Sequence, residues 1–392
     1  MSLRESSRDE NAHRMLGGAP GVPALGRGPL PAGEFSRLDY DHPAAGWGAA
    51  RSVGHVLEKS GIPEEGVRAL FVMNHEEGGF DCPGCAWPDD PTGLRLDLCE
   101  NGVKHVTWEL TRKQVDRDFF AAHTVTELES WSDYDLEAAG RLAEPMRYDP
   151  ATDHYVPISW DDAFELVGGA LRGLHSPHEA SFYTSGRLNN EATFLYQLWV
   201  REFGTNNLPD CSNMCHEASG RALMPALGTD KGTVDLHDWE QADAIWLLGD
   251  NAATNAPRML TWLAEAERRG AKLVHINPLI EAASRRTIVP HEFVDMATFH
   301  TTRIGTMNVQ VRIGGDMALM RGVAKAVFEA AATDPSVLDS EFVDTLTHGF
   351  DEYRALCEQT PWSELVEGAG VDEAAIRNLA QSYLTSGRVI IA

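Results

Sequence analysis

The sequence predicts an α/β protein in which a small cysteine-containing domain precedes doubly wound α/β domains. The main observation is a strand, helix, strand order that runs from ADAIWLLGDN (242–251) through a helical segment (259–269) to AKLVHINP (271–278). A further apolar run, SGRVIIA (386–392), also has the character of a buried strand. Strands that alternate with crossover helices imply a parallel sheet with both faces covered.

Composition supports a folded, acidic protein. With 392 residues, 43% of them hydrophobic, the chain can bury more than one core. The formal net charge is −26, from 33 Lys and Arg against 59 Asp and Glu. Such a surface does not neutralise phosphates or anionic lipid, so we expect neither nucleic acid nor a membrane surface as a partner.

The N-terminal stretch MSLRESSRDENAHRM has neither the apolar core of a signal peptide nor a twin-arginine signal. No later stretch is apolar for long enough to span a bilayer. We therefore expect a cytoplasmic protein without a membrane span. Six cysteines in such a chain are better explained by chemistry or burial than by a disulfide framework.

The first part of the chain divides into an arm and a small domain. Residues 1–45 are rich in Gly, Pro, Ala and Arg without a sustained apolar period, which predicts a flexible N-terminal arm. Residues 46–145 mix short apolar runs with turn signals and form the predicted small domain around the thiols. Within it, GVKHVTWEL (102–110) alternates in the manner of a strand.

From Ser159 on, the pattern becomes that of the α/β domains. SWDDAFELVGGALRGL (159–174) has apolar residues at helical spacing, which predicts a helix capped by Ser159. ASFYTSG (180–186) predicts a short buried strand, and NNEATFLYQLWVREFG (189–204) an amphipathic helix that ends at Gly204. Because the chain stops within a buried strand, we expect it to be a fragment, incomplete at the C-terminus.

Two thiols in DCPGCAWPDD (81–90) can face one concavity, because Pro83 fixes its backbone and Gly84 allows a positive φ. Cys82 and Cys85, with Cys99 further on, are competent to hold zinc or an iron–sulfur cluster. Thiols buried without a metal are an equally good interpretation, and the spacing alone leaves both open. No fourth cysteine lies nearby, so the candidates for a fourth ligand are Asp81, Asp89, Asp90 and His75.

A second thiol site is predicted in LPDCSNMCHEASG (208–220), which contains Cys211 and Cys215. If a helix begins at Glu217, its dipole stabilises the thiolate of Cys215, which then becomes a candidate nucleophile or ligand for a soft metal. His216 beside it is a candidate proton carrier. The alternative is a small apolar residue beside a surface histidine.

Three further segments place small or polar residues where a strand gives way to a loop: WLLGDNAATNAPR (246–258), VHINP (274–278) and RIGGDMALM (312–320). This is the edge at which α/β sheets bind nucleotide-like ligands. The GDN sequence lacks the GxGxxG spacing, which argues against a classical nicotinamide site. Asp316 has a second interpretation as the cap of the helix that follows it.

In order along the chain, the CxxC at Cys82, SWDDAF, TSGRLNNEATF, FGTNNLPDCSNMCHEAS, LLGDN and AKLVHINP resemble the molybdopterin oxidoreductase family. The likeness is strongest to the formate dehydrogenase-H-like branch of YdeP type, and it is most specific from Phe203 to Ser219. It implies an iron–sulfur-type domain (46–145), the first part of an α/β pterin-binding domain (146–210) and a truncated α/β domain that binds molybdopterin guanine dinucleotide (211–392).

The resemblance also implies roles for single residues. Cys215 would ligate molybdenum and His216 would handle the proton, with Mo-bis(molybdopterin guanine dinucleotide) as cofactor. Cys82, Cys85 and Cys99 would hold a [4Fe-4S] cluster.

The remaining implied roles concern the cofactor's surroundings. Lys104 would lie between the cluster and a pterin. The residues that are similar to the family's contacts to one guanine dinucleotide arm are Gly249, Asp250, Asn251, Asn277 and Asp316.

The sequence departs from the family pattern in three respects. AWPDD replaces the third of the usual four cluster cysteines, so the cluster is held by Asp89 or another group, altered, or absent. Leu279 stands where the family often has Arg, and Arg258, Arg285 or Arg286 could replace that phosphate contact. Family members also continue beyond residue 392 with the rest of the pterin-binding region and a β-barrel.

The predicted function of the intact protein is that of a molybdenum-dependent, formate dehydrogenase-like oxidoreductase. It would move two electrons to or from a small substrate, through an iron–sulfur centre, with an electron-carrier protein as partner. The fragment by itself is expected to be inactive. The alternative is a zinc-stabilised nucleotide-binding protein, or a fragment without redox activity.

Overall fold

The computed structural model describes residues 42–60, 63–75, 78–85, 87–89, 97–185, 188–211, 213 and 216–392. The predicted arm up to residue 41 and Cys215 lie outside the described residues. The chain forms two compact units, which we describe separately. One unit consists mainly of Thr111–Gly232, and the other of Asp41–Glu58, Ile62–Leu110 and Thr233–Ala392. The four-part division derived from the sequence stays a prediction.

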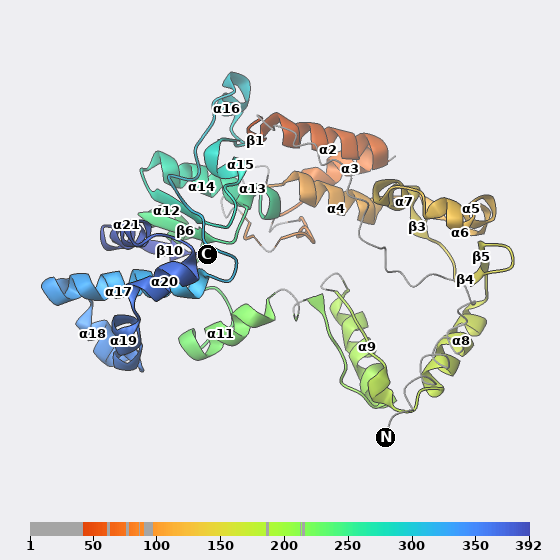
Figure 1. Cartoon of the computed structure of the whole chain (residues 1–392). Coiled ribbons are helices and arrows are strands. Elements are labelled where there is room, and N and C mark those ends of the chain that lie inside the picture. The colour runs from red at the N-terminus through yellow and green to blue at the C-terminus, as the bar shows by residue number, and fades with distance from the viewer. Residues whose placement is uncertain are drawn as a thin grey trace. The chain divides into compact units, whose positions relative to one another are not determined.

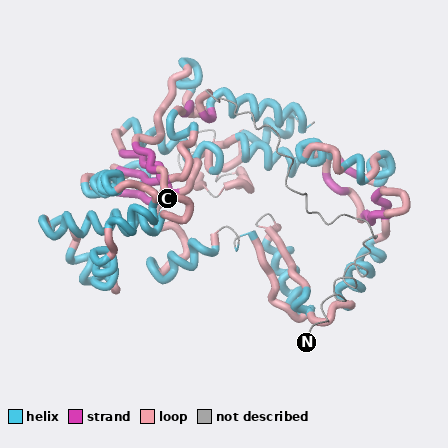
Figure 2. Tube along the Cα trace, viewed as in Figure 1, coloured by secondary structure: helices cyan, strands magenta, loops and turns pink. Residues whose placement is uncertain are grey.

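A four-stranded parallel sheet organises the second unit, in the order β10-β6-β7-β9. Figures 1 and 2 show these strands side by side. The predicted parallel sheet is therefore confirmed, and SGRVIIA pairs with β6. The strands are β6 (Ala244–Leu248), β7 (Lys272–Ile276), β9 (Met307–Val309) and β10 (Val389–Ile391).

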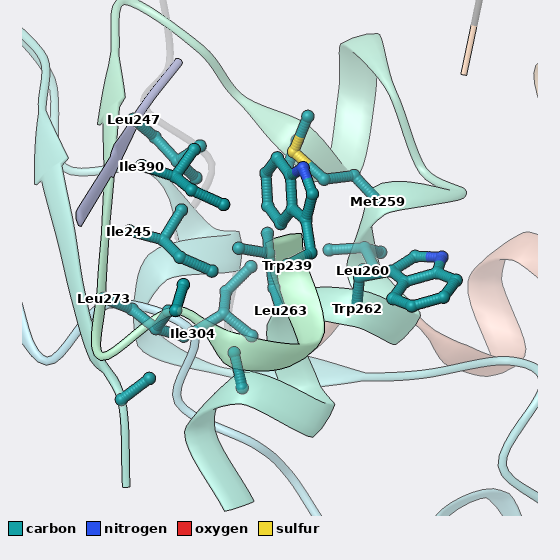
Figure 3. Close-up of a cluster of buried hydrophobic side chains, with 14 of the residues drawn as sticks. Trp239, Ile245, Leu247, Met259, Leu260, Trp262, Leu263, Leu273, Ile304 and Ile390 are labelled. Atoms are coloured by element: carbon teal, nitrogen blue, oxygen red, sulfur yellow. The ribbon is translucent and has the colours of Figure 1, made fainter. Parts of the chain in front are cut away.

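Successive residues of β6 point to opposite faces of the sheet, as the period of a strand requires. Ile245 and Leu247 enter one core, where they pack with residues of α14 (Met259–Arg268) (Figure 3). Trp246 enters a second core with residues of α17 (Asp316–Thr333) and α21 (Glu373–Leu384). Both faces of the sheet are covered, as the sequence predicts.

The remaining elements of this unit surround the sheet or precede it in the chain. Strand β1 pairs in parallel with β8. The bounds are β1 (Ala44–Ala45), α2 (Gly46–Ser60), α3 (Pro63–Leu70), α4 (Glu100–Leu110), α12 (Leu236–Gln241), α13 (Ala252–Asn255), α15 (Ala282–Arg285), β8 (Thr287–Ile288), α16 (Phe293–Thr298), η2 (Pro335–Val337), α18 (Ser340–Leu346), α19 (Phe350–Gln359) and α20 (Trp362–Ala369).

The predicted strand at residues 102–110 is wrong, because this segment is the helix α4. Its buried residues include Val103, Val106 and Thr107, which are spaced three and four apart and so share one helical face. Val103 and Val106 pack with Ala69 and Met73 in a small core. The alternation of apolar and polar letters was a local coincidence within a helical period.

The first unit contains short strand pairs and the predicted amphipathic helices. Helix α8 begins after Ser159, whose side chain accepts a hydrogen bond from Asp162 N, and α9 ends at Gly204 with φ +105°, so both predicted helices are confirmed. The bounds are β2 (Gln114–Val115), α5 (Arg117–Ala122), α6 (Val125–Leu128), α7 (Asp133–Ala139), β3 (Arg141–Leu142), β4 (Met146–Asp149), β5 (His154–Pro157), α8 (Trp160–Arg172), η1 (Pro177–Glu179), α9 (Asn190–Phe203) and α11 (Glu217–Leu227).

The predicted strand at 180–186 does not form within the described part of that segment. Thr184 makes only an isolated bridge to Asp210. The Asn207 side chain instead donates hydrogen bonds to the carbonyls of His178 and Ala180. Phe182 N donates to the backbone O of Asn207 at 2.9 Å. Single backbone bonds together with side-chain bonds thus satisfy this short apolar run without a continuous ladder.

In the described residues, no helix is long and apolar enough to cross a membrane.

Candidate functional site

Most of the predicted ligand-contacting residues gather at the carboxyl edge of the sheet. Gly249, Asp250 and Asn251 follow β6, and Asn277 follows β7. Gly249 has φ +71°, which L side chains rarely adopt, and its N–H donates to Ile276 O at 2.9 Å. The side-chain amide of Asn277 lies 3.5 Å from Asp250 O. The structure therefore brings these four residues together.

Asp316 differs from the others. It is the first residue of α17, with an exposed side chain, and the helix is capped at Gly315 without a side-chain hydrogen bond. The interpretation of Asp316 as a helix cap is therefore wrong. Gly315 N donates to Arg312 O at 2.8 Å, so a backbone turn closes this end of the helix.

The edge of the sheet carries polar atoms whose hydrogen-bonding capacity is not used. Among the described residues, Asp250 Oδ2 and Asn251 Oδ1 are buried acceptors without a hydrogen-bond partner. Burial raises the pKa of Asp250, while hydrogen bonds from Asn255 and from the backbone of Asn251 act in the opposite direction. Buried acceptors are costly unless a donor reaches them. The edge is therefore suited to a ligand that presents N–H or O–H groups.

His275 does not neutralise Asp250. This residue of β7 is buried, and its Nε2 lies 2.8 Å from Ile304 O, to which it donates in the neutral tautomer. Burial lowers the pKa of His275, so the ring stays neutral near pH 7. Asp250 thus faces a neutral imidazole rather than a cation.

The three predicted cluster ligands, which lie in the same unit, line one cavity. Cys82, Cys85 and Cys99 surround a volume of about 20 Å³, room for roughly one water molecule. Gly84 N and Gly102 N donate to the sulfurs of Cys82 and Cys99, each at 3.3 Å. Burial raises the pKa of the Cys99 thiol to about 11. We call these three side chains the cysteine cradle.

Gly102 explains how the cradle closes around Cys82. A Cβ at Gly102 would lie 2.8 Å from Cys82 Sγ, closer than real contacts allow. A side chain there would push α4 away from the thiol. The glycine is therefore needed for the approach of α4 to the cradle.

The cradle supplies the thiol donors that soft metals and iron–sulfur clusters prefer, but fewer of them than a four-iron cluster uses. Within the described residues, no three His, Cys, Asp or Glu side chains converge closely enough to hold a metal ion. Asp81 and His75 do not line the cavity, and Asp90 lies outside the described residues. The carboxylate of Asp89 is bound by Arg258 at 2.9 Å.

This ion pair corrects two expectations. Asp89 is not a spare fourth ligand, and Arg258 is not a spare phosphate-binding cation, because each is engaged by the other. Lys104, predicted to lie between cluster and pterin, has its Nζ 4.7 Å from the centroid of the Trp108 ring.

The second thiol segment lies in the other unit. The predicted helix start at Glu217 is confirmed, and His216 is the exposed N-cap residue of α11. Asn213 holds this turn: its Oδ1 accepts from Asp210 N at 2.9 Å, and its Nδ2 donates to Glu217 Oε2 at 2.5 Å. Cys215, within this turn, lies outside the described residues.

A polar depression adjoins this turn. Its volume is about 430 Å³, enough for a small ligand. Asn213 and Glu217 of the turn contribute to it together with His178, Glu179 and Asn207.

Comparison with known proteins identifies the chain. Residues 141–332 match the family model described as molybdopterin oxidoreductase. The protein YdeP of Escherichia coli K12 is 46% identical over 357 residues, which are 90% of this chain and 47% of that protein. The chain belongs to the molybdopterin oxidoreductase family. It spans about half the length of the curated relatives that it matches.

Other similar proteins include a named oxidoreductase, a formate dehydrogenase subunit and a hydratase. The uncharacterized oxidoreductase Rv2900c of Mycobacterium tuberculosis H37Rv is 47% identical over 82% of this chain and 42% of its own. Subunit alpha of F420-dependent formate dehydrogenase 1 of Methanococcus maripaludis is 25% identical over 58% of this chain and 30% of its own. Among solved structures, acetylene hydratase from Pelobacter acetylenicus covers 60% of this chain and 29% of its own, with 20% identity and a TM-score of 0.45.

For a molybdopterin oxidoreductase, a molybdopterin cofactor follows from the family. The unpartnered acceptors of Asp250 and Asn251 fit the donor groups of such a cofactor's outer parts. Sequence reasoning missed Asn74, and it missed that Arg258 is buried in ion pairs near the cradle. Their partners are distant in sequence or lack any motif. A signal was available only for Asn74, since Asn is common at positive φ, here +58°.

Proposed function

We propose that the intact protein is a molybdenum-dependent oxidoreductase of the formate dehydrogenase-like type, acting in the cytoplasm on a small polar substrate. The observation that carries the proposal is the family match over residues 141–332. That range contains both the Cys215-His216 turn and the edge loops at residues 249–251 and 277. The similarity to a formate dehydrogenase subunit supports the reaction class.

In this proposal the edge of the sheet binds one guanine dinucleotide arm of the cofactor. Asp250 and Asn251 offer buried acceptors to the donors of a base or ribose. Gly249 leaves open space beside them, because a Cβ placed there would meet no atom within 4 Å. Asn277 completes the polar edge. Asp316 begins the helix that follows β9, and its exposed carboxylate can accept hydrogen bonds from the hydroxyls of a ribose.

The chemistry belongs to the turn before α11. Mo-bis(molybdopterin guanine dinucleotide), when bound, supplies two-electron redox chemistry at the metal. The thiolate of Cys215 would be the protein ligand to molybdenum, favoured by its place just before the N-terminus of α11. The exposed imidazole of His216 would accept or return the substrate proton. Asn213 would hold the turn through Asp210 and Glu217.

Electrons would leave or enter through an iron–sulfur centre at Cys82, Cys85 and Cys99. The cradle supports this role by its three thiols, while the missing fourth cysteine predicts a centre with three protein thiolates. The next carrier would be a small redox protein. Zinc at the cradle, with nucleotide bound at the edge and no redox activity, is the alternative, and it is favoured by the same shortage of ligands.

The deciding experiment uses a full-length protein expressed in a host that makes the cofactor. Metal content is measured for Mo, Fe and Zn, and formate oxidation is followed with an artificial electron acceptor. We expect Mo in the wild type, and loss of both Mo-dependent turnover and the thiolate-to-molybdenum absorption in Cys215→Ala. Cys211→Ala, in the same turn, is the control that keeps both.

Two results would withdraw the proposal. One is full turnover in Cys215→Ala. The other is stoichiometric Zn without Mo in the wild type, which would support the zinc-stabilised nucleotide-binding protein instead.

A further inference from the structure

The side chain of Arg258, just before α14, is enclosed with only 3% of its surface exposed. Its Nε donates to Asp97 Oδ1 and one terminal nitrogen donates to Trp87 O, both at 2.7 Å. The other terminal nitrogen donates to Pro88 O at 3.0 Å, to Asp89 Oδ1 at 2.9 Å and to the second carboxylate oxygen of Asp97. All three guanidinium nitrogens are thus bound to the chain between the second and third cysteines of the cradle.

The contacts continue from Asp97 to the backbone of Cys82. Asp97 O accepts a hydrogen bond from Asn74 Nδ2 at 2.6 Å. Asn74 Oδ1 in turn accepts from Cys82 N at 2.9 Å. Asn74 is buried and has φ +58°, a conformation that Asn adopts more readily than most residues with a side chain. A continuous path of hydrogen bonds therefore runs from the guanidinium of Arg258 to the backbone of Cys82.

The same arrangement reaches the edge of the sheet. Arg258 ends the loop that begins at Gly249 and contains α13, and Asn255 and Pro257 of that loop line the cradle cavity together with the thiols. Asn101, at the start of α4, donates to Thr254 O at 2.8 Å, which is a second tie between the same two segments. In Figure 1, α4 and α13 lie in the same part of this unit.

The type of side chain matters for this role. A guanidinium presents several donors in a rigid plane, so it can bind two carboxylates and two carbonyls at once, which the single nitrogen of lysine cannot do. Both carboxylates are mostly enclosed, with 15% and 16% of their surface exposed. Removal of the cation would leave them close together with no compensating charge, so the segment would have to move towards water.

We propose that Arg258 is a positioning residue that holds the cysteine cradle against the loop of the sheet edge. Arg258 holds the segment that a fourth cysteine would otherwise hold by binding a metal. The geometry of the cradle therefore does not depend on a bound metal. If the proposed function holds, this geometry also sets the electron path between the cradle and the cofactor arm. The positioning of the cradle by Arg258 does not rest on the proposed function.

The test measures the reactivity of single thiols in the full chain after metal is removed with a chelator. Alkylation of Cys82, Cys85 and Cys99 is followed by peptide mass spectrometry, with the fully buried Cys357 as internal reference. In Arg258→Lys and Arg258→Met we expect the cradle thiols to react roughly tenfold faster or more, because several charge-assisted hydrogen bonds are lost. Cys357 should react at the wild-type rate.

Two further variants keep the result interpretable. Arg269→Lys, at the other end of α14, removes a guanidinium that donates to Trp239 O at 2.7 Å, and it should leave the cradle thiols unchanged. Asp89→Asn removes one of the two carboxylates and should give an intermediate rate without unfolding the unit. Wild-type thiol rates in Arg258→Lys would overturn the proposal, and so would an equal rise at Cys357, which would mean general unfolding.

A separate measurement tests whether the geometry of the cysteine cradle is independent of a bound metal. Hydrogen exchange of residues 97–110 is compared in the wild type with and without chelator, on protein from a host that supplies iron and zinc. Unchanged protection supports the proposal, and a loss of protection on chelation alone overturns it. Neither experiment uses molybdenum or turnover, so a failed oxidoreductase assignment leaves this result standing.

Discussion

Helices α14 and α8 both have apolar residues at helical spacing but lie in different surroundings. Both are amphipathic, and both follow a turn in a region of mixed strands and helices. In α14, seven of ten residues are buried, mostly in the core shown in Figure 3. In α8, no residue is buried within the described structure, and Trp160 and Phe164 are 63% and 65% exposed.

Helix α9 extends the contrast. Val200 is its buried residue, while Phe194 and Leu195 are 64% and 62% exposed. The difference teaches that apolar spacing identifies a helix and the face it offers, but not the partner that covers this face. In the sheet unit, the strands cover the apolar faces of the helices. The helices of the other unit offer apolar faces that the described residues leave open.

The largest expected effect tests this contrast directly with two matched leucines. Leu263→Ala in α14 should lower the free energy of unfolding of the sheet unit by about 2–5 kcal/mol, because it leaves a cavity in a closed core. Leu198→Ala in α9, where the side chain is 54% exposed, should change stability by less than about 0.5 kcal/mol. Urea denaturation followed by tryptophan fluorescence and circular dichroism gives both values. A comparable loss in Leu198→Ala would show that the face of α9 is covered in solution.

A second pair of variants compares glycines in the two units. Gly249→Ala should cost about 1–2 kcal/mol, because φ is +71° and the left-handed conformation is unfavourable with a Cβ. Gly169→Ala within α8 should instead stabilise by about 0.5–1 kcal/mol, because alanine is the better helix former and the added Cβ meets no atom within 4 Å. Thermal unfolding of both variants reports the sign. The same sign in both would contradict the backbone assignment at Gly249.

The effect of a helix cap on stability should be the same in the two units. Ser159 Oγ accepts from Asp162 N at 3.0 Å at the start of exposed α8, and Asp235 Oδ1 accepts from Asp238 N at 3.1 Å at the start of α12. Replacement of either residue by Ala should cost about 1 kcal/mol, since a cap acts through local backbone groups. Chemical denaturation measures both losses. A cost at Ser159 near zero would indicate that α8 frays at this end.

The smallest effect concerns Asp250. Because burial raises its pKa in the folded chain, the unfolded chain ionises first as pH rises. Stability contributed by this residue is therefore lost as pH increases from about 4 through the folded pKa. Asp250→Asn should raise the melting temperature by about 1–2 °C at pH 7 and less at pH 4. An equal shift at both pH values would contradict the raised pKa.

Much of the fold was predictable because its signals are local. The parallel pairing of β6 with β7 follows from two apolar runs of strand length with a helix between them. The same local reasoning failed at 102–110, where Val103 and Val106 suit either a strand or a helix, and packing against Ala69 and Met73 decides for the helix. It also failed at 180–186, where Asn207 bonds Ala180 O through its side chain and Phe182 N through its backbone carbonyl without a continuous ladder.

Some features of the candidate site could likewise be predicted from the sequence, and others could not. The edge residues Gly249, Asp250, Asn251 and Asn277 could be predicted, because parallel strands end at one edge whatever their sequence separation. The charge state around Asp250 could not be predicted, since the neutrality of the neighbouring His275 depends on its burial in the folded unit. The pairing of Arg258 with Asp89 and Asp97 joins positions 169 and 161 residues apart, and no spacing rule connects them.

The sequence by itself determined the family, the alternation of strands and helices in the central α/β unit, the ends of α8 and α9 set by Ser159 and Gly204, and the kinds of donor available to a cofactor. These depend on residue type and short-range spacing, which the chain carries wherever it folds. Only the tertiary structure decided which amphipathic faces are buried, which carboxylates are already paired and which acceptors remain for a ligand. Those properties depend on atoms brought together from distant segments, because burial and charge pairing arise between surfaces rather than within them.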